Sequence, residues 1–228
     1  MSILAPARLA APWVISLCSQ KGGVGKTTLA LLLAATTADI SGRALVIDAD
    51  TQGSATEIAQ AADSLPFDIL AAEPGTLTRL REATGYDTVF VDMAGSLDAL
   101  GTLGQVMQST DLAIIPMIPE RQSVTPTLRT AQAIGDAGVP FRVVVNLADP
   151  LRGPGPVEAA WELLDREGIP RMRTFMRRYV SITQSQLDGI PLTRYRGDRS
   201  WRPALDDARR LQTELLLILG RMAQEARA

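Results

Sequence analysis

The chain has 228 residues, of which 46% are hydrophobic, with a net charge of −2 and a mean hydropathy of +0.09. These values are typical of a globular protein and exclude an intrinsically disordered chain, and we expect residues 1–228 to form a single domain. The absence of histidine and the single cysteine, Cys18, exclude histidine general bases, an intramolecular disulfide and a cysteine-rich metal centre within one chain. The N-terminus lacks a basic segment followed by a long apolar run, so we expect a cytoplasmic protein.

Short apolar runs alternate with segments of helical length along the chain. The expected strands are residues 13–18, 44–48, 88–92, 112–116 and 141–146. The expected helices are residues 27–40, 77–84, 97–109, 123–137, 157–167, 180–187 and 203–226, with an N-terminal extension at 1–12 and a loop at 149–156. This alternation predicts an α/β fold with a doubly wound, mostly parallel sheet and helices on both faces, whose binding sites lie at the carboxyl ends of the strands.

The stretch SQKGGVGKTT at residues 19–28 lies between the first expected strand and the first expected helix. Glycines in such a connection let backbone N–H groups converge on phosphate oxygens, and the helix N-terminus adds its positive end. In this pattern a lysine reaches the β- and γ-phosphates and a hydroxyl ligates Mg²⁺. The residues predicted to bind a nucleotide are Gly22, Gly23, Val24, Gly25, Lys26, Thr27 and Thr28, with Thr27 also predicted as the Mg²⁺ ligand. Because Gln20 stands where the common pattern has glycine, a glycine-rich turn without a ligand is the alternative.

Both lysines of the chain lie in this stretch, at Lys21 and Lys26, whereas the other 21 basic residues are arginines. A compact ammonium group and a planar guanidinium group are not interchangeable in a phosphate site. We therefore predict that both lysines are required for the chemistry of this site.

The sequence KGGVGKT resembles the motif K-G-G-x-G-K-[ST] of the ParA/MinD family of deviant Walker A ATPases. This resemblance implies a P-loop fold, ATP and Mg²⁺ as cofactors, and slow ATP hydrolysis stimulated by a partner protein. It also implies an ATP-dependent homodimer in which Lys21 reaches the phosphates bound by the partner subunit. On this basis Lys21 and Lys26 are assigned as catalytic residues.

Carboxylates follow two further expected strands. A strand period of two places Asp48 and Asp50 on the same side, and the family resemblance implies that Asp50 is catalytic and positions the attacking water and the Mg²⁺ shell. Thr51 replaces the proline usual in that segment. Asp92 ends the next strand and is predicted to bind Mg²⁺ through water, with Asp50. The following run DMAGSL is similar to that of small plasmid ParA proteins of the ParF type. The alternative is that these acids only terminate strands.

Residues 166–202 carry nine arginines and three acids, which gives a local net charge of +6. Clustered arginines can neutralise DNA phosphates without sequence preference. The family resemblance implies nonspecific DNA binding through C-terminal basic residues, and we predict that Arg177 and Arg178 contact DNA. The alternative is a solvated surface that balances the acidic first half of the chain.

The favoured function is that of a ParA-type partition ATPase, nucleoid-associated in its ATP form, which works with a ParB-like adaptor on a plasmid or chromosome. Positioning of a protein microcompartment is the nearest alternative. A MinD-like membrane switch is a second, because Leu211, Leu215 and Leu219 belong to an apolar stripe; core packing explains the same stripe, and no membrane binding is expected. A metabolic P-loop ligase or kinase would leave Lys21 unexplained, and an iron–sulfur carrier would need cysteines after the glycine-rich stretch.

Overall fold

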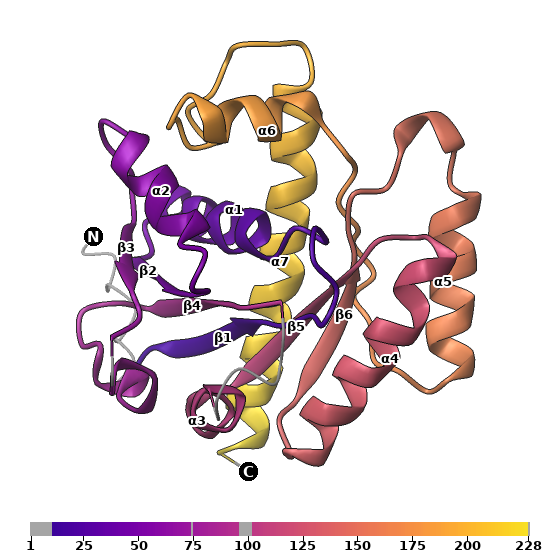
Figure 1. Cartoon of the computed structure of the whole chain (residues 1–228), viewed down its shortest axis with the longest axis horizontal. Coiled ribbons are helices and arrows are strands. Elements are labelled where there is room, and N and C mark those ends of the chain that lie inside the picture. The colour runs from indigo at the N-terminus through magenta and orange to yellow at the C-terminus, as the bar shows by residue number, and fades with distance from the viewer. Residues whose placement is uncertain (1–10, 74, 96–101, 228) are drawn as a thin grey trace, which may run out of the picture.

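Six parallel strands form the centre of the computed structural model, which describes residues 11–73, 75–95 and 102–227 (Figure 1). The strands are β1 (Trp13–Leu17), β2 (Ala44–Ala49), β3 (Asp68–Ala71), β4 (Thr88–Met93), β5 (Leu112–Met117) and β6 (Phe141–Val145). Their order in the sheet is β3-β2-β4-β1-β5-β6, so β1 lies between β4 and β5 in the middle of the sheet. The predicted parallel α/β sheet is confirmed.

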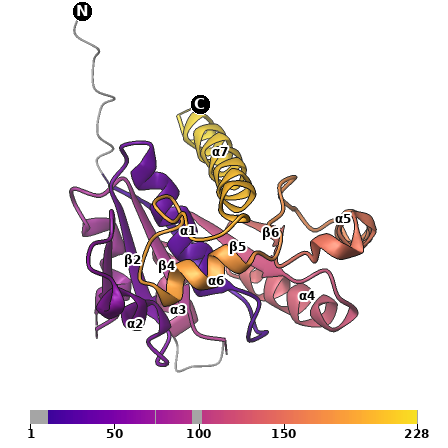
Figure 2. The ribbon, with the colours of Figure 1, turned by 90° about the horizontal axis from the view of Figure 1, so that it is seen from above.

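Helices cover both faces of this sheet. They are α1 (Lys26–Asp39), α2 (Ser54–Ala61), α3 (Thr102–Ser109), α4 (Arg121–Asp136), α5 (Gly155–Arg166), α6 (Val180–Leu187) and α7 (Trp201–Glu225). The core on one face joins α1, α6 and α7, and the core on the other joins α3, α4 and α5. Figure 2 shows α7 and α4 on opposite sides of the sheet. Strands β1, β2, β4 and β5 are therefore buried on both faces, which explains their continuous apolar runs in the sequence.

The segment between β2 and β4 differs from expectation. Helix α2 and strand β3 were not predicted, because β3 is a four-residue edge strand with mostly exposed side chains and little hydrophobic pattern. The helix expected at 77–84 is wrong: two 3₁₀ turns, Thr76–Thr78 and Leu80–Glu82, occupy this segment. Only Leu77 and Leu80 are buried there, and a 3₁₀ turn places residues three apart on the same side. Residues 97–101 of the expected helix 97–109 lie outside the described residues.

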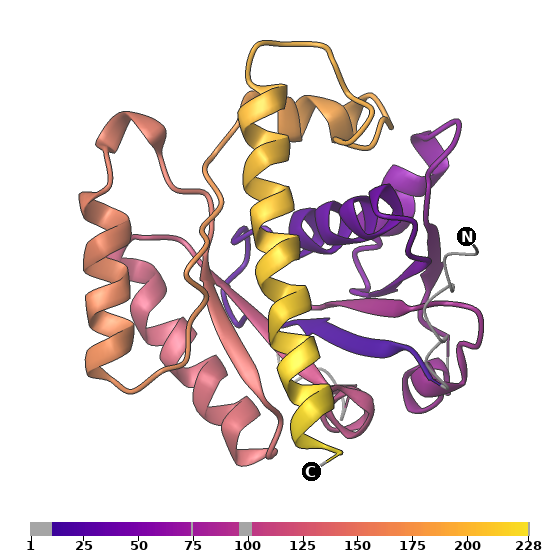
Figure 3. The same ribbon diagram turned by 180° about the vertical axis from the view of Figure 1, so that it is seen from behind.

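The C-terminal helix α7 crosses in front of the sheet in Figure 3. Leu211, Leu215 and Leu219 are buried in the core, so packing within the chain accounts for the apolar stripe of this helix. Polar contacts add to the α1–α7 contact, since Gln212 Nε2 donates to Thr37 Oγ1 at 3.0 Å. None of the helices that the structure describes combines the length and apolar character needed to cross a membrane.

A buried carboxylate joins the segment between α5 and α6 to α7. Asp207 accepts hydrogen bonds from Arg177 Nε at 2.8 Å, Arg177 Nη2 at 2.7 Å and the Tyr179 hydroxyl at 2.9 Å. The Arg177 guanidinium also lies 5.4 Å from the centre of the Tyr179 ring. Burial and the bond to Asp207 raise the pKa of the Tyr179 hydroxyl. Arg177 is therefore an anchor for α7.

Replacing Asp207→Asn removes the charge that holds Arg177 and Tyr179. We expect the free energy of unfolding, measured by urea denaturation, to fall by about 2 to 3 kcal/mol, because loss of one partner leaves the other charge uncompensated. The neighbouring variant Asp206→Asn is the matched control, since Asp206 is exposed on the same helix, and its effect should stay within about 0.5 kcal/mol. Equal effects of the two substitutions would contradict the anchoring role.

Candidate nucleotide-binding site

The register of the central strands brings the glycine-rich stretch and two acids to one edge of the sheet. Asp92 of β4 is paired with Leu17 of β1 on one side and with Asp48 of β2 on the other. Phe90 and Val46, each two residues earlier, belong to the core that contains α1. Strand alternation therefore turns both carboxylates toward the face covered by α1, and Asp92 lies next to the point where the glycine-rich stretch leaves β1.

Two glycines in this stretch have backbone conformations that side chains disfavour. Gly23 and Gly25 have φ angles of 72° and 86°, in the left-handed region. A Cβ atom on Gly25 would also lie 2.5 Å from Asn146 Nδ2. The same amide donates a hydrogen bond to the Val24 carbonyl at 2.7 Å, so a residue that follows β6 fixes the turn. The tight turn leads directly into α1.

The start of α1 supplies N–H groups suited to phosphate oxygens. Gly25 is the N-cap residue, and the first intrahelical hydrogen bond runs from Leu29 N to the Gly25 carbonyl. The N–H groups of Lys26, Thr27 and Thr28 therefore have no acceptor within the helix. Together with the positive end of the helix dipole, they form an anion-binding site.

Lys26 lies beneath the segment that follows β4. Its side chain is buried, and its Nζ atom is 3.8 Å from the position that a Cβ atom on Gly95 would occupy. A Cβ atom at this distance would be in ordinary van der Waals contact, so the observation shows that residue 95 lies beside the ammonium group and does not show that glycine is required there. Residues 96–101, which continue this segment, lie outside the described residues.

Asp92 has the properties of a residue that holds a cation. It is fully buried, and neither of its carboxylate oxygens has a hydrogen-bond donor in bonding geometry among the described residues. Burial raises the pKa of its carboxyl to about 6, while the adjacent Thr27 hydroxyl and Lys26 ammonium lower it by less. A hard cation with oxygen ligands would satisfy the carboxylate, and Thr27 and Asp92 fit Mg²⁺ in this way.

Asp48 and Asp50 have different surroundings. Asp48 Oδ2 accepts bonds from the backbone N–H and the hydroxyl of Thr56, both at 2.9 Å, so Asp48 fixes the first turn of α2. Strand β2 ends at Ala49, and strand alternation does not extend to Asp50. The Asp50 carboxylate instead accepts the Gln52 N–H at 3.0 Å within the loop. Its assignment as a catalytic and metal-binding residue stays a prediction.

Lys21 is directed toward α4 in the described chain. Its Nζ atom donates to the Ser123 hydroxyl at 2.9 Å, and the neighbouring Gln20 N–H donates to Thr130 Oγ1 at 3.2 Å. A single chain does not test whether Lys21 reaches a partner subunit, so this assignment stays a prediction. Ser123 is a residue that the sequence analysis missed, because its distance of 102 residues from Lys21 leaves no local pattern.

Asn146 and Gly95 were also missed as site residues. Both follow strands at the carboxyl edge of the sheet, and that position was the available signal. Position alone did not distinguish them, since other polar residues and glycines also follow strands. The contacts of Asn146 with Val24 and of Gly95 with Lys26 depend on the strand order, which the sequence did not reveal.

The two arginines predicted to contact DNA differ. The guanidinium of Arg177 is occupied by Asp207, whereas Arg178 has an exposed side chain and a backbone N–H that donates to the Ala148 carbonyl at 2.8 Å. Arg178 lines a small hollow with Glu120, Asp149 and Arg152, beside the ends of β5 and β6. The two arginines therefore differ in how available their side chains are, and DNA contact stays a prediction for both.

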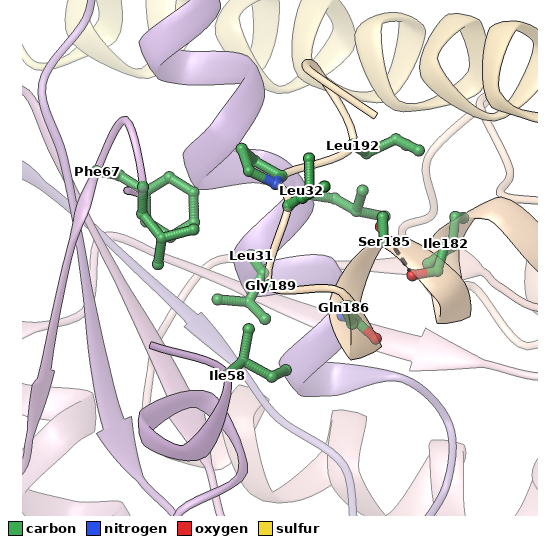
Figure 4. Close-up of a pocket in the computed structure, with 12 residues that line it drawn as sticks. Leu31, Leu32, Ile58, Phe67, Ile182, Ser185, Gln186, Gly189 and Leu192 are labelled. Carbon is green, nitrogen blue, oxygen red and sulfur yellow. Dashed lines mark hydrogen bonds between the residues drawn. The ribbon is translucent and has the colours of Figure 1, made fainter. Parts of the chain in front are cut away.

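An apolar pocket connects the helices that follow the two site loops. Figure 4 shows Leu31 and Leu32 of α1, Ile58 of α2 and Ile182 of α6 around this pocket. The contact between α2 and α6 is close, because a Cβ atom on Gly189 would lie 2.6 Å from the Ala61 carbonyl oxygen. Apolar side chains around this pocket therefore join α1, which follows the glycine-rich loop, to α2, which follows the Asp48–Asp50 loop.

The glycine turn, the buried lysine and the unpartnered Asp92 at the carboxyl edge of a parallel sheet define a P-loop nucleotide-binding protein. Residues 15–223 match the family model described as the CobQ/CobB/MinD/ParA nucleotide binding domain, and the chain belongs to this family. The resemblance to the ParA/MinD ATPases is thereby confirmed. Members are nucleotide-binding ATPases, and the cofactors are ATP and Mg²⁺.

Known proteins are similar to this chain over different lengths. The maintenance of carboxysome distribution protein A of Gloeobacter kilaueensis is 36% identical over 207 residues, which cover 90% of this chain and 94% of that protein. The chromosome-partitioning ATPase Soj of Thermus thermophilus is 36% identical over 118 residues, 38% of this chain and 47% of that protein. The septum site-determining protein MinD of Pyrococcus horikoshii, solved with Mg-ADP, has a TM-score of 0.70 and 21% identity, covering 87% and 94% of the two chains.

The raised pKa of Asp92 predicts a pH-dependent stability in the absence of nucleotide and metal. Between about pH 4 and pH 6 the folded chain retains a proton that the unfolded chain releases, so this carboxyl lowers the free energy of unfolding as pH rises. Asp92→Asn removes the titrating group. We expect the free energy of unfolding of the variant, relative to the parent, to increase from pH 4 to pH 7 by at most about 3 kcal/mol.

The measurement is urea denaturation across this pH range in the presence of a chelator. Asp63→Asn, which removes an exposed carboxyl group, is the matched control. A difference between Asp92→Asn and the parent that is the same at every pH would contradict the assignment of the titration to Asp92.

Proposed function

We propose that this protein is an ATP-driven positioning ATPase that dimerises on ATP, binds DNA without sequence preference and distributes a protein microcompartment. The observation that carries this proposal is the similarity to a carboxysome distribution protein over nine tenths of both chains. It favours the positioning alternative over plasmid or chromosome partition, which was the favoured prediction from the sequence. The adaptor would then be a protein attached to the compartment in place of a ParB-like protein bound to a centromere.

The described residues suit the ATP site in this scheme. The N–H groups of residues 26–28 and the Lys26 ammonium bind the phosphates, and Lys21 of each subunit reaches the phosphates held by the other. Thr27 and Asp92 would hold Mg²⁺, which would neutralise part of the phosphate charge. Asp50 orients the attacking water. The Asp50 carboxylate accepts the Gln52 N–H through Oδ1, which leaves Oδ2 available to water. In this proposal hydrolysis is slow and is stimulated by a partner protein.

The surface suited to DNA is a groove beside α7, which we call the α7 groove. Its charged lining residues are Arg142, Arg171, Arg173, Arg209, Arg210, Arg221, Asp206 and Glu214. Six arginines against two acids give this groove a local charge of +4. The Glu214 carboxylate accepts the backbone N–H groups of Arg173 and Thr174, both at 2.7 Å, so its charge is partly compensated.

Not every arginine of the α7 groove is equally available. Arg171 is bound to Asp165, and Arg209 is bound to Asp39. Arg173 and Arg221 are exposed and form no ion pair with another described residue. We therefore propose Arg173 and Arg221, with the exposed Arg178, as the main contacts to DNA phosphates, while Arg177 acts through its structural bond to Asp207.

An electrophoretic mobility shift with duplex DNA tests this function. We expect binding with ATP, and no binding with ADP or without nucleotide. Arg173→Ala/Arg221→Ala should weaken DNA binding by about three- to thirtyfold. It should also reduce the slope of log K against log salt by about 2, because fewer counterions are released on binding when two phosphate contacts are lost. Lys21→Ala should abolish the DNA binding that the parent shows with ATP.

The charge-matched control is Arg79→Ala/Arg166→Ala, which removes two arginines whose side chains are 72% and 71% exposed elsewhere on the molecule. This control should bind DNA like the parent. An equal loss in both double variants would mean that net charge, and not the α7 groove, controls binding. ATP-independent binding in the parent would contradict the proposed function.

Partition remains the second candidate, supported by the similarity of part of the chain to a chromosome-partitioning ATPase. Deletion of the gene separates the two functions in the cell. We expect labelled shell proteins of a microcompartment to lose their even spacing, while plasmid retention and chromosome number per cell stay unchanged. Loss of plasmids or production of cells without a chromosome, with normally spaced compartments, would instead establish partition.

A further inference from the structure

Lys21 is the one lysine of the site whose side chain is held by a helix outside the glycine turn. Its Nζ atom donates to Ser123 Oγ at 2.9 Å, and Ser123 is 1% exposed in the first turn of α4. Ser123 is itself held in place, since its N–H donates to the Glu120 carbonyl at 2.9 Å. The ammonium group therefore has a fixed, buried acceptor within its own chain.

The backbone around Lys21 is anchored separately from the side chain. The Lys21 N–H donates to Ser19 Oγ at 3.1 Å, and the Gln20 N–H donates to Thr130 Oγ1 at 3.2 Å. Thr130 is fully buried in α4, two turns beyond Ser123. The side chain of Lys21 can thus leave Ser123 by rotation about its own bonds, without displacement of residues 19–21.

The electrostatics of this resting position favour release. The Ser123 hydroxyl is neutral, and the first turn of α4 contains no acidic residue; the acid that precedes this turn, the N-cap residue Glu120, is exposed. A cation at a helix N-terminus also meets the positive end of the helix dipole. Among the described residues no carboxylate forms an ion pair with Lys21. A triphosphate offers several negative charges to the same ammonium, so Lys21 is held by a weak acceptor and attracted by a strong one.

We propose that Ser123 is a positioning residue for Lys21. It retains the ammonium on α4 in the nucleotide-free chain, and this hydrogen bond must break before Lys21 can bind phosphates in a partner subunit. Ser123 thereby sets the threshold of ATP-dependent dimerisation. This inference rests on the proposed function, since it requires that Lys21 acts across a dimer.

The first experiment measures the Lys21–Ser123 bond directly. Because the chain contains two lysines, protein labelled with ¹⁵N-lysine gives two side-chain ammonium signals, which Lys21→Arg assigns. In nucleotide-free protein, Ser123→Ala should shift the Lys21 signal and accelerate its proton exchange, leaving the Lys26 signal in place. Ser123→Thr retains a hydroxyl and should resemble the parent. An unchanged Lys21 signal in Ser123→Ala would overturn the proposal.

The second experiment measures dimerisation by sedimentation velocity with a non-hydrolysable ATP analogue. Loss of a hydrogen bond to a half-exposed ammonium should let Ser123→Ala dimerise at about two- to tenfold lower protein concentration. Ser123→Thr and the exposed control Thr125→Ala should match the parent. A shifted Lys21 signal with an unchanged or higher threshold would overturn the regulatory part of the proposal.

Two further outcomes are distinguishable. If the parent does not dimerise with the analogue, the proposed function fails, and with it the control of dimerisation by Ser123, while the NMR result still decides whether the bond exists. If Ser123→Ala unfolds below the working temperature, Ser123→Cys keeps the size of the side chain with a weaker acceptor and should give the same two changes.

Discussion

A buried carboxylate without a hydrogen-bond partner, Asp92, lies beside a turn of glycines that exposes backbone N–H groups. Parallel pairing of β4 with β1 and β2 fixes this juxtaposition, since it places Asp92 between Leu17 and Asp48. Uncompensated charges in a protein interior are costly, and they persist where a ligand or cation repays the cost. A metal-bound nucleotide would supply both a cation for the Asp92 carboxylate and an anion for the N–H groups of the turn.

The glycine turn also depends on the other half of the sheet. The Asn146 amide holds the Val24 carbonyl from the end of β6, and α4 holds residues 20 and 21 through Thr130 and Ser123. The strands that bear these contacts lie on the opposite side of β1 from Asp92. A substitution in either half of the sheet is therefore expected to alter the conformation of the glycine turn.

Charge in the C-terminal half serves two purposes. Arg177, Arg171 and Arg209 each form ion pairs within the chain, and the pair with Asp207 joins the segment between α5 and α6 to α7. Other arginines remain exposed along the α7 groove. The arginines counted in the sequence therefore belong to two groups. A count of charges does not separate those that form ion pairs within the chain from those available to a polyanion.

The sequence by itself determined the parallel α/β fold, the glycine turn and the positions of Lys26, Asp92 and α7. These features depend on local sequence patterns: apolar runs of strand length, a cluster of glycines before a helix, and an acid at the end of an apolar strand. The β3 edge strand and the two 3₁₀ turns were not predicted from the sequence, because they are short and bury few side chains. Only the tertiary structure decided that Lys21 is held by Ser123, that Asn146 closes on Val24 and that Arg177 is committed to Asp207. Partners 102, 122 and 30 residues apart meet through strand order and helix packing, and such contacts leave no periodicity in a single sequence.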